Sequence, residues 1–374
     1  IVDGEPKTID VSKDYSIGSN YAENVQITSD SGYSLYIDSA TKGTINGQQL
    51  TVNGQTFFTR SGVELAIGTK GVTNTVSINS SNQFVVFSGY GAKVNINAEN
   101  INLNSYADFA ASAVWGEGGG FISLNGENIN INAKNYGLIA FSGSELNVNG
   151  NLVVNVVNAK NAIDTRGNAI ININTDGKHT TVLNGDIVFE TPSTENGSII
   201  NSNININLSG EESSWTGRAY QEYQVKVGNE SGRYELIYSA ELDAPDYCGD
   251  VTGFKMNIND GASWNMTGDS FINNITVENG GVVNVQEGVK EFNVGIAVNS
   301  DTGGDNSNTG GITLNNGAIN LQGENQEVNV TNLTGNGGTI NTNSLYNKMN
   351  IKIVDKDTSV TVNGSGEIAD AIYG

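Results

Sequence analysis

Few side chains in this sequence could take part in acid–base catalysis. The chain has a single histidine, and its four arginines are dispersed along its length. Asp164, Arg166 and Asp176 are the one group that successive turns of the chain could bring together. Carboxylates beside an arginine would suit a polysaccharide lyase or a glycosidase. Because no further acid or base accompanies these three residues, we expect them to be structural, and we expect no enzymatic activity.

A second pattern has the residue types of a serine hydrolase. Gly268-Asp269-Ser270 resembles the first sequence block of lipolytic esterases, and the segment from Asp176 to His179 resembles their aspartate–histidine block. In that family the histidine block follows the serine, whereas here it precedes the serine. Ser270 also falls where the strand pattern indicates a turn, and the histidine falls in a polar turn. We therefore expect no catalytic triad.

One loop carries the oxygen ligands that a hard cation prefers. Residues 301–308 read DTGGDNSN, in which Asp301, Asp305 and Asn306 offer carboxylate and amide oxygens of the kind that bind calcium. The tandem nonapeptide of calcium-binding β-rolls is absent, and a loop rich in glycine and asparagine needs no ion. The sequence predicts no cofactor, with this loop as the calcium candidate. The single cysteine, Cys248, excludes an internal disulfide.

Charge and composition narrow the class of protein. Forty acidic side chains against eighteen basic ones give a net charge of −22, which repels phosphate backbones and anionic lipid. We therefore expect neither nucleic acid nor a membrane surface as partner. The chain contains 56 asparagines, 47 glycines and only 3 prolines. Asparagine and glycine disfavour helices and favour tight turns, so the aliphatic residues between them predict many short strands.

Short alternating runs recur along the chain. Residues 128–132 read NININ, and related runs occur at 94–104, 146–156, 170–175 and 202–208. Strand side chains point alternately to opposite faces, so the aliphatic residues form one face and the amides the other. The strings VVFSG at 85–89, ASAVWG at 111–116 and IAFSG at 139–143 recur at intervals of about 27 residues.

This repeat predicts an all-β solenoid. Each segment of about 23–28 residues holds three short strands, which would close one triangular coil of a parallel β-helix. Inward aliphatic side chains would then stack into a continuous core, and asparagines at corners would tolerate left-handed backbone and form ladders. A β-sandwich of several domains and a disordered chain are the competing interpretations.

The repeat is interrupted between residues 211 and 254. This segment holds five of the 14 tyrosines, and its runs QEYQVKVG and RYELIYSA alternate on either side of the turn cluster GNESGR. We expect a β-hairpin that projects from the solenoid. Its aromatic residues either pack against the flank of the solenoid or contact a ligand. The candidate ligand-binding residues are Tyr220, Tyr223, Arg233, Tyr234, Tyr238 and Tyr247.

Two stretches with a tryptophan carry a family resemblance. LSGEESSWTG at 208–217 and DGASWNMTGDSFINNITVENGGVVNV at 260–285 resemble the repeat of autotransporter passenger domains of Gram-negative bacteria, with Trp215 and Trp264 at the repeated position. The resemblance implies a right-handed parallel β-helix. It would have a cap and first coils at 1–60, coils at 61–210, the hairpin insertion at 211–254, and coils at 255–374. These last coils would continue toward a translocating β-barrel outside this sequence.

The family resemblance implies a surface role. We expect an extracellular passenger that is displayed on the outer membrane of a Gram-negative bacterium or released from it, with a role in virulence or colonisation. Its expected partner is a glycan or protein on a host or bacterial surface. The favoured hypothesis is an adhesin that binds through the hairpin. The alternative is a passenger that binds further copies of itself and drives cell aggregation and biofilm formation, for which a neutral amide face is suited because many weak hydrogen bonds add up. A polysaccharide-degrading enzyme is the third hypothesis.

Overall fold

The structure is a computed structural model built almost entirely of parallel strands. Its described residues contain no helix, and hence none that could span a membrane. The chain divides into two compact units, residues 1–185 and 186–374. The described residues are 15–17, 24–37, 42–58, 63–81, 84–107, 109–114, 119–158, 160–190, 193–195, 198–200, 202–226, 234–238, 253–295, 310–364, 367–369 and 372–373.

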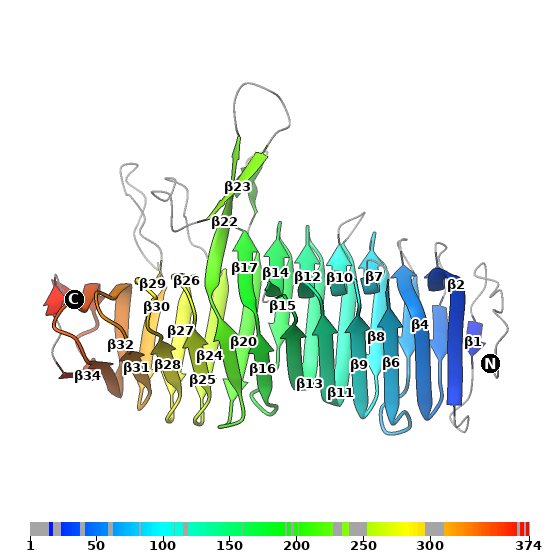
Figure 1. Cartoon of the computed structure of the whole chain (residues 1–374), viewed down its shortest axis with the longest axis horizontal. Coiled ribbons are helices and arrows are strands. Elements are labelled where there is room, and N and C mark those ends of the chain that lie inside the picture. Colours follow the sequence, from blue (N-terminus) through cyan, green and yellow to red (C-terminus); the bar gives the residue numbers. More distant parts are fainter. Residues whose placement is uncertain are drawn as a thin grey trace. The chain divides into compact units, whose positions relative to one another are not determined.

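In the first unit the chain passes in turn through three parallel sheets (Figure 1). The first sheet contains β1 (Tyr15–Ile17), β3 (Lys42–Ile45), β5 (Glu64–Ile67), β8 (Lys93–Asn97), the first parts of β11 (Phe121–Ala133) and β13 (Glu145–Val156), and β15 (Ile170–Ile173). The second contains the first parts of β2 (Asn24–Ile37) and β4 (Gln49–Phe58), then β6 (Thr75–Ser80), β9 (Asn100–Ser105), the last parts of β11 and β13, and β16 (Thr181–Asn184). The third contains the last parts of β2 and β4, then β7 (Phe84–Gly89), β10 (Phe109–Val114), β12 (Tyr136–Phe141) and β14 (Asn161–Arg166).

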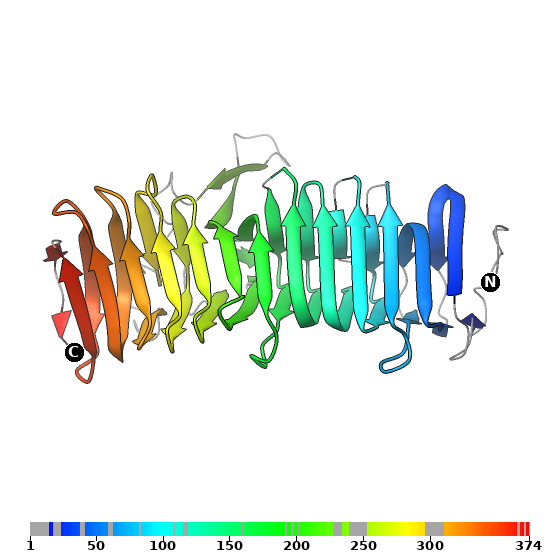
Figure 2. The same cartoon turned by 60° about the horizontal axis from the view of Figure 1, so that its bottom comes forward.

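The second unit repeats this arrangement (Figure 2). Its first sheet contains β20 (Asn203–Ser209), β24 (Phe254–Asn259), β27 (Asn274–Glu278), β30 (Gly311–Asn315), the middle of β32 (Glu327–Thr342), the end of β33 (Lys348–Val354) and β36 (Ile372–Tyr373). The second contains β21 (Ser214–Gly217), β25 (Ser263–Met266), β28 (Val282–Val285), β31 (Ala318–Leu321), the end of β32 and β34 (Ser359–Gly364). In the third, β17 (Asp186–Glu190) pairs with β22 (Ala219–Lys226), and β26 (Ser270–Ile272), β29 (Glu291–Val294), the starts of β32 and β33, and β35 (Glu367–Ala369) pair in succession.

Within the described residues of the second unit, two pairs of strands are antiparallel. Strands β18 (Ser193–Glu195) and β19 (Ser198–Ile200) form a short hairpin. The two alternating runs of the interrupted segment are β22 and β23 (Tyr234–Tyr238), and they pair antiparallel from Glu222 and Tyr238 to Lys226 and Tyr234. Strand β22 therefore belongs to the third sheet at its start and to a projecting hairpin at its end, as Figure 1 shows.

Each unit is thus a parallel β-helix, as the repeat predicts. Inward side chains of successive coils stack on one another, because parallel in-register strands place equivalent residues side by side. One such column in the second sheet of the first unit is completely buried and purely aliphatic. Its members are Ile78, Leu103, Ile131 and Leu183, with Val154 between the last two.

The predicted coil length of about 23–28 residues is wrong for two coils of the second unit. Met256 pairs with Ile275, and Ile275 with Ile312, so these coils take 19 and 37 residues. The step from Ile206 to its partner Met256 takes 50 residues because it contains the predicted hairpin. In the first unit the step from Ile131 to Val154 takes 23 residues. The core constrains only the strands, so loops and the hairpin can lengthen a coil without disturbing the stack.

Candidate functional surfaces

Asp164 and Arg166 form a closed ion pair at the end of β14. The Asp164 carboxylate is 1% exposed and accepts hydrogen bonds from Arg166 Nε at 2.9 Å, from Arg166 Nη2 at 3.0 Å and from Asn161 Nδ2 at 3.2 Å. The guanidinium also lies 5.3 Å from the centre of the Phe141 ring. Both carboxylate oxygens are used within this strand, so the arrangement is that of a satisfied buried pair.

Asp176 pairs elsewhere. Its carboxylate accepts the Lys178 backbone N–H at 3.2 Å and lies 3.4 Å from Lys178 Nζ, in an exposed turn after β15. The hydrogen bond from the Lys178 backbone holds the pKa of Asp176 below 3.8, and the Lys178 side chain lowers it further. Asp176 therefore pairs with Lys178 in its own turn and does not join the Asp164–Arg166 ion pair.

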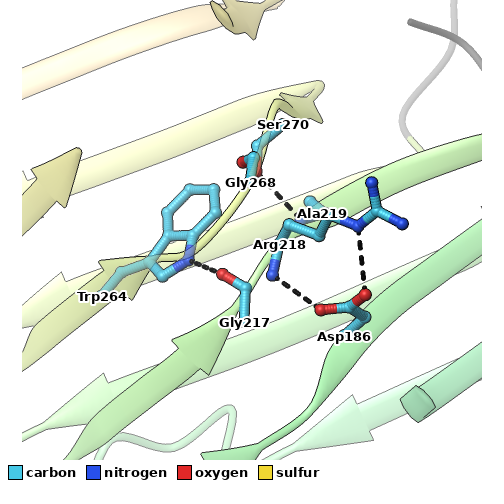
Figure 3. A network of polar contacts seen from close by, with 7 residues as sticks. All are labelled: Asp186, Gly217, Arg218, Ala219, Trp264, Gly268 and Ser270. Carbon is cyan, nitrogen blue, oxygen red and sulfur yellow. Dashed lines mark hydrogen bonds and ion pairs between the residues drawn. The ribbon is translucent and has the colours of Figure 1, made fainter. Parts of the chain in front are cut away.

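Ser270 is fixed by backbone groups at the root of the hairpin (Figure 3). The side chain is 3% exposed, and its hydroxyl donates to the Gly268 carbonyl at 2.8 Å and accepts the Ala219 N–H at 3.2 Å. The hydroxyl therefore ties β26 to the start of β22. The serine therefore has a structural role, and it is the first residue of β26, whereas the sequence pattern indicates a turn at this position. A nucleophile needs an adjacent base.

The same network anchors the first residues of β22. The Asp186 carboxylate accepts the Arg218 backbone N–H and the Arg218 Nε–H, each at 3.1 Å, and the guanidinium stacks 4.6 Å from the centre of the Tyr220 ring. Trp264 donates its indole N–H to the Gly217 carbonyl at 3.0 Å. Figure 3 shows the Asp186 carboxylate and the Trp264 indole on either side of this short segment. These contacts therefore hold the start of β22, from which the hairpin extends, in place.

The tyrosine candidates fall into three groups. Tyr220 is 9% exposed and belongs to the anchored start of β22. Tyr223 lies in register with Ile237, and Tyr234 and Tyr238 stand at the two ends of the paired part of β23, but their side chains lie outside the described part of the structure. Arg233 and Tyr247 also lie outside it, as do Asp301, Asp305 and Asn306 of the calcium candidate. Within the described residues, no three His, Cys, Asp or Glu side chains are grouped to hold a metal ion.

A continuous ladder of asparagines runs along the second sheet of the first unit. Each side-chain N–H donates to the amide oxygen of the asparagine one coil earlier, at distances of 2.8 to 3.3 Å. All five bonds run in the same direction along the chain, so the amides are aligned head to tail. The rungs are Asn53, Asn79, Asn104, Asn132, Asn155 and Asn184.

This ladder is one edge of a larger surface without charge. The outward positions of six strands in the second sheet hold asparagine, glutamine, serine, threonine and valine only, and eleven of the seventeen are asparagine. We call this surface the asparagine face. Its members are Gln49, Thr51, Asn53, Thr75, Ser77, Asn79, Asn100, Asn102, Asn104, Asn128, Asn130, Asn132, Asn151, Val153, Asn155, Val182 and Asn184.

Neighbouring columns of the asparagine face are also hydrogen-bonded across coils. Asn128 donates to Asn100 at 2.9 Å, and Asn130 donates to Asn102 at 3.2 Å. The side chains are therefore held in fixed orientations before any partner arrives. Glu99 and Glu127 are exposed and directly precede Asn100 and Asn128, so acidic charge flanks the face without entering it.

The second unit carries a shorter ladder, and its net charge is more negative. Asn265, Asn284, Asn320, Asn341 and Asn363 are linked in the same direction at 2.8 to 3.0 Å. This unit holds 8 basic and 25 acidic residues, a net charge of −17, whereas the first unit holds 10 and 15, a net charge of −5. The asparagine face therefore belongs to the less acidic of the two units.

The alternation of asparagine and isoleucine predicted the outward amides, but the sequence alone did not single out one ladder. A signal was present, because each strand of this ladder contains an aliphatic residue followed directly by asparagine, at or near the end of its part in the second sheet. The Arg218–Asp186 anchor was also missed, since its two residues lie 32 positions apart. No known protein family, curated protein sequence or solved structure matches this chain.

Proposed function

We propose that the chain is the adhesive passenger of a Gram-negative cell-surface protein, that it acts without enzymatic chemistry, and that its asparagine face contacts the ligand. The observation that carries this proposal is a charge-free face of seventeen positions on a chain with a net charge of −22. Net charge keeps an acidic protein soluble, and this surface carries none of that charge.

The ladder suits an adhesive surface. Its amides are already fixed by hydrogen bonds to neighbouring rungs, so a partner orders few side chains when it binds. Each contact contributes little, but contacts repeated over six strands act together, and the total grows with the length of the face that is covered. A surface of this kind gives strong attachment without a deep pocket.

The packing of the tryptophans supports the assignment to autotransporter passengers. Trp215 and Trp264 pair in register and stack in the core, so the two stretches that resemble the passenger repeat occupy the same place in consecutive coils. Passengers of this type are displayed outside the cell. Antibody labelling of intact cells of the source bacterium tests this location.

Attachment of a displaying strain tests the adhesive face. A non-adherent laboratory bacterium that displays the chain is applied to epithelial monolayers and to mucin-coated plates. The double substitution Asn104→Asp and Asn132→Asp places two carboxylates in the ladder, and we expect it to reduce attachment at least tenfold. The matched control is Asn284→Asp with Asn320→Asp, which makes the same change in the second unit and should preserve attachment.

The outcome can contradict the proposal in two ways. Equal loss in both double variants would mean that ladder disruption, and not the face, is responsible. Undiminished attachment in the first variant would show that the asparagine face does not contact the ligand. A third variant replaces residues 223–250 with a short glycine–serine linker, which keeps the part of β22 that pairs with β17. Loss of attachment in this variant alone would assign the contact to the hairpin.

Self-association is the second candidate function, and one observation favours it. Two copies of the first unit share the same interval between rungs, so their asparagine faces could hydrogen-bond in register over every coil. The net charge of −5 on that unit opposes the approach of a second copy less than the −17 of the other unit does. Sedimentation of the purified chain at increasing concentration tests this function, because a strict monomer throughout would contradict it.

A further inference from the structure

We infer that the asparagine face takes a neutral, hydroxyl-rich linear polysaccharide as its ligand. The inference rests on the proposed function and specifies the chemistry of the partner. It follows from three properties of the face: the hydrogen-bonding groups that the ladder leaves over, the absence of charged and aromatic side chains, and the repetition of the same groups from coil to coil.

The ladder leaves a defined set of hydrogen-bonding groups. Asn104 donates one N–H to Asn79 and accepts one from Asn132, and Asn132 is bonded in the same way between Asn104 and Asn155. A primary amide has two N–H donors and two lone pairs on its oxygen. Each inner rung therefore has one donor and one acceptor outside the ladder. A hydroxyl group both donates and accepts, so it can satisfy both groups of one rung.

The composition of the face excludes other ligand classes. Without lysine or arginine it offers nothing to pair with phosphate, sulfate or uronate groups, and without carboxylates it offers nothing to a cation. Val153 and Val182 are its only apolar side chains, and both are half-buried, so a lipid or an aromatic ligand would bury little apolar area. A neutral polar ligand is the class that remains.

The repetition favours a polymer over a single sugar. Adjacent strands lie about 4.8 Å apart, so the six rungs of the ladder cover about 24 Å. A single sugar would contact one or two rungs, and its few hydrogen bonds would largely replace bonds to water. A chain of sugars along the face would contact every rung at once, so the affinity should rise steeply with the number of sugars.

Affinity electrophoresis of the purified full chain tests this inference. The gels contain a neutral polysaccharide (mannan, laminarin, dextran or xyloglucan) or an anionic one (alginate or hyaluronan). We expect at least one neutral polymer to retard the chain and neither anionic polymer to do so. For the polymer that binds, oligosaccharides of two to eight sugars should compete with rising strength, with at least a tenfold difference between the shortest and the longest.

Matched variants locate the site. The substitutions Asn104→Asp with Asn132→Asp should abolish retardation, whereas Asn284→Asp with Asn320→Asp should leave it unchanged. Circular dichroism and thermal unfolding of both variants confirm that they fold. Retardation by the anionic polymers, equal retardation of all variants, or affinity that does not depend on oligosaccharide length would each overturn the inference.

The experiments distinguish a failure of this inference from a failure of the proposed function. If no neutral polymer retards the chain but Asn104→Asp with Asn132→Asp still abolishes cell attachment, the face is adhesive and its ligand is not a glycan. Concentration-dependent sedimentation that the same variant removes would then identify a second copy as the occupant. If the variant leaves cell attachment intact, the asparagine face is not the adhesive surface.

Discussion

The indole of Trp264 lies flat on the indole of Trp215, with ring centroids 4.3 Å apart and ring planes 13° apart. Both rings are fully buried, and both stand at the same register position of paired strands β21 and β25. The Phe292 ring, from the neighbouring sheet, stands at 88° to the Trp264 ring, with centroids 5.4 Å apart. The repeated tryptophan is thus a core residue whose large ring fills the coil, and in Trp264 the indole N–H also ties the strand to Gly217.

Trp264→Phe should lower the free energy of unfolding by about 2 kcal/mol. The change removes the indole N–H bond to the Gly217 carbonyl and leaves a void beside Trp215. Urea unfolding followed by circular dichroism measures the loss. Tyr106→Phe is the control, since Tyr106 is 69% exposed and its variant should stay within about 0.5 kcal/mol of the parent.

Loss of a central rung should destabilise the first unit more than loss of the last one. Asn104→Ala removes hydrogen bonds to both Asn79 and Asn132, whereas Asn184→Ala removes one, to Asn155. We expect about 1–2 kcal/mol for the central rung and about half of that for Asn184, measured by urea unfolding. Equal losses would show that the bonds of the ladder do not contribute separately.

Asp164→Asn should cost about 3 kcal/mol of stability. The substitution leaves the Arg166 guanidinium without its bidentate carboxylate and turns an amide N–H toward it. Asp176→Asn is the matched control, because this exposed carboxylate serves only its own turn, and a change within about 0.5 kcal/mol is expected. Similar losses of stability in the two variants would contradict the expectation that the buried carboxylate contributes more than the exposed one.

Gly150→Ala should prevent or severely weaken folding. Gly150 has φ +151°, and a Cβ atom there would lie 2.2 Å from the Gly126 carbonyl oxygen of the preceding coil. The clash is with backbone, so the expected cost is about 3 kcal/mol or more. Gly71→Ala is the control. Gly71 has φ +76° with no atom within 4 Å of an added Cβ, so only the strain of about 1–2 kcal/mol should appear in its thermal unfolding.

The carboxyl group of Asp176 should titrate below pH 3.8. Because the pKa is lower in the folded state, the group stabilises the fold above its unfolded value, and this contribution is lost as the pH falls through the folded pKa. The main cause is the Lys178 backbone N–H, which Lys178→Ala retains. Carboxyl NMR titration of that variant should therefore show a pKa that rises but stays below 3.8. Full return to 3.8 would assign the shift to the lysine charge instead.

The fold could be predicted because its signals are local. Alternation of Ile and Asn within four or five residues sets which side chains face inward, and related strings recur about once per coil. The 50-residue step from Ile206 to Met256 could also be predicted in outline, because the sequence marks the hairpin that this step contains. The steps of 19 and 37 residues that follow could not be predicted, because the core constrains the strands and not the loops between them.

The buried amides also escaped prediction. Asn174 is completely buried, although most asparagines here face outward, because its side chain bonds to both backbone groups of Gly150 and to the Thr181 hydroxyl. Asn347 similarly bonds to Gly323 and Gln326. These residues replace missing strand pairing at turns between coils. That role depends on which distant backbone groups lack a partner, which a single sequence does not reveal.

The sequence by itself determined that aliphatic residues would face one side of each strand and asparagines the other, since strand geometry alternates whatever the chain pairs with. The tertiary structure decided which asparagines meet. Asn104 and Asn132 are 28 residues apart, and only the length of the intervening turns brings their amides to 3.0 Å. It also decided that these amides share a face with no charge, because that property depends on the register of six strands at once. A one-residue slip in any strand would reverse its faces, and the buried aliphatic column prevents that slip.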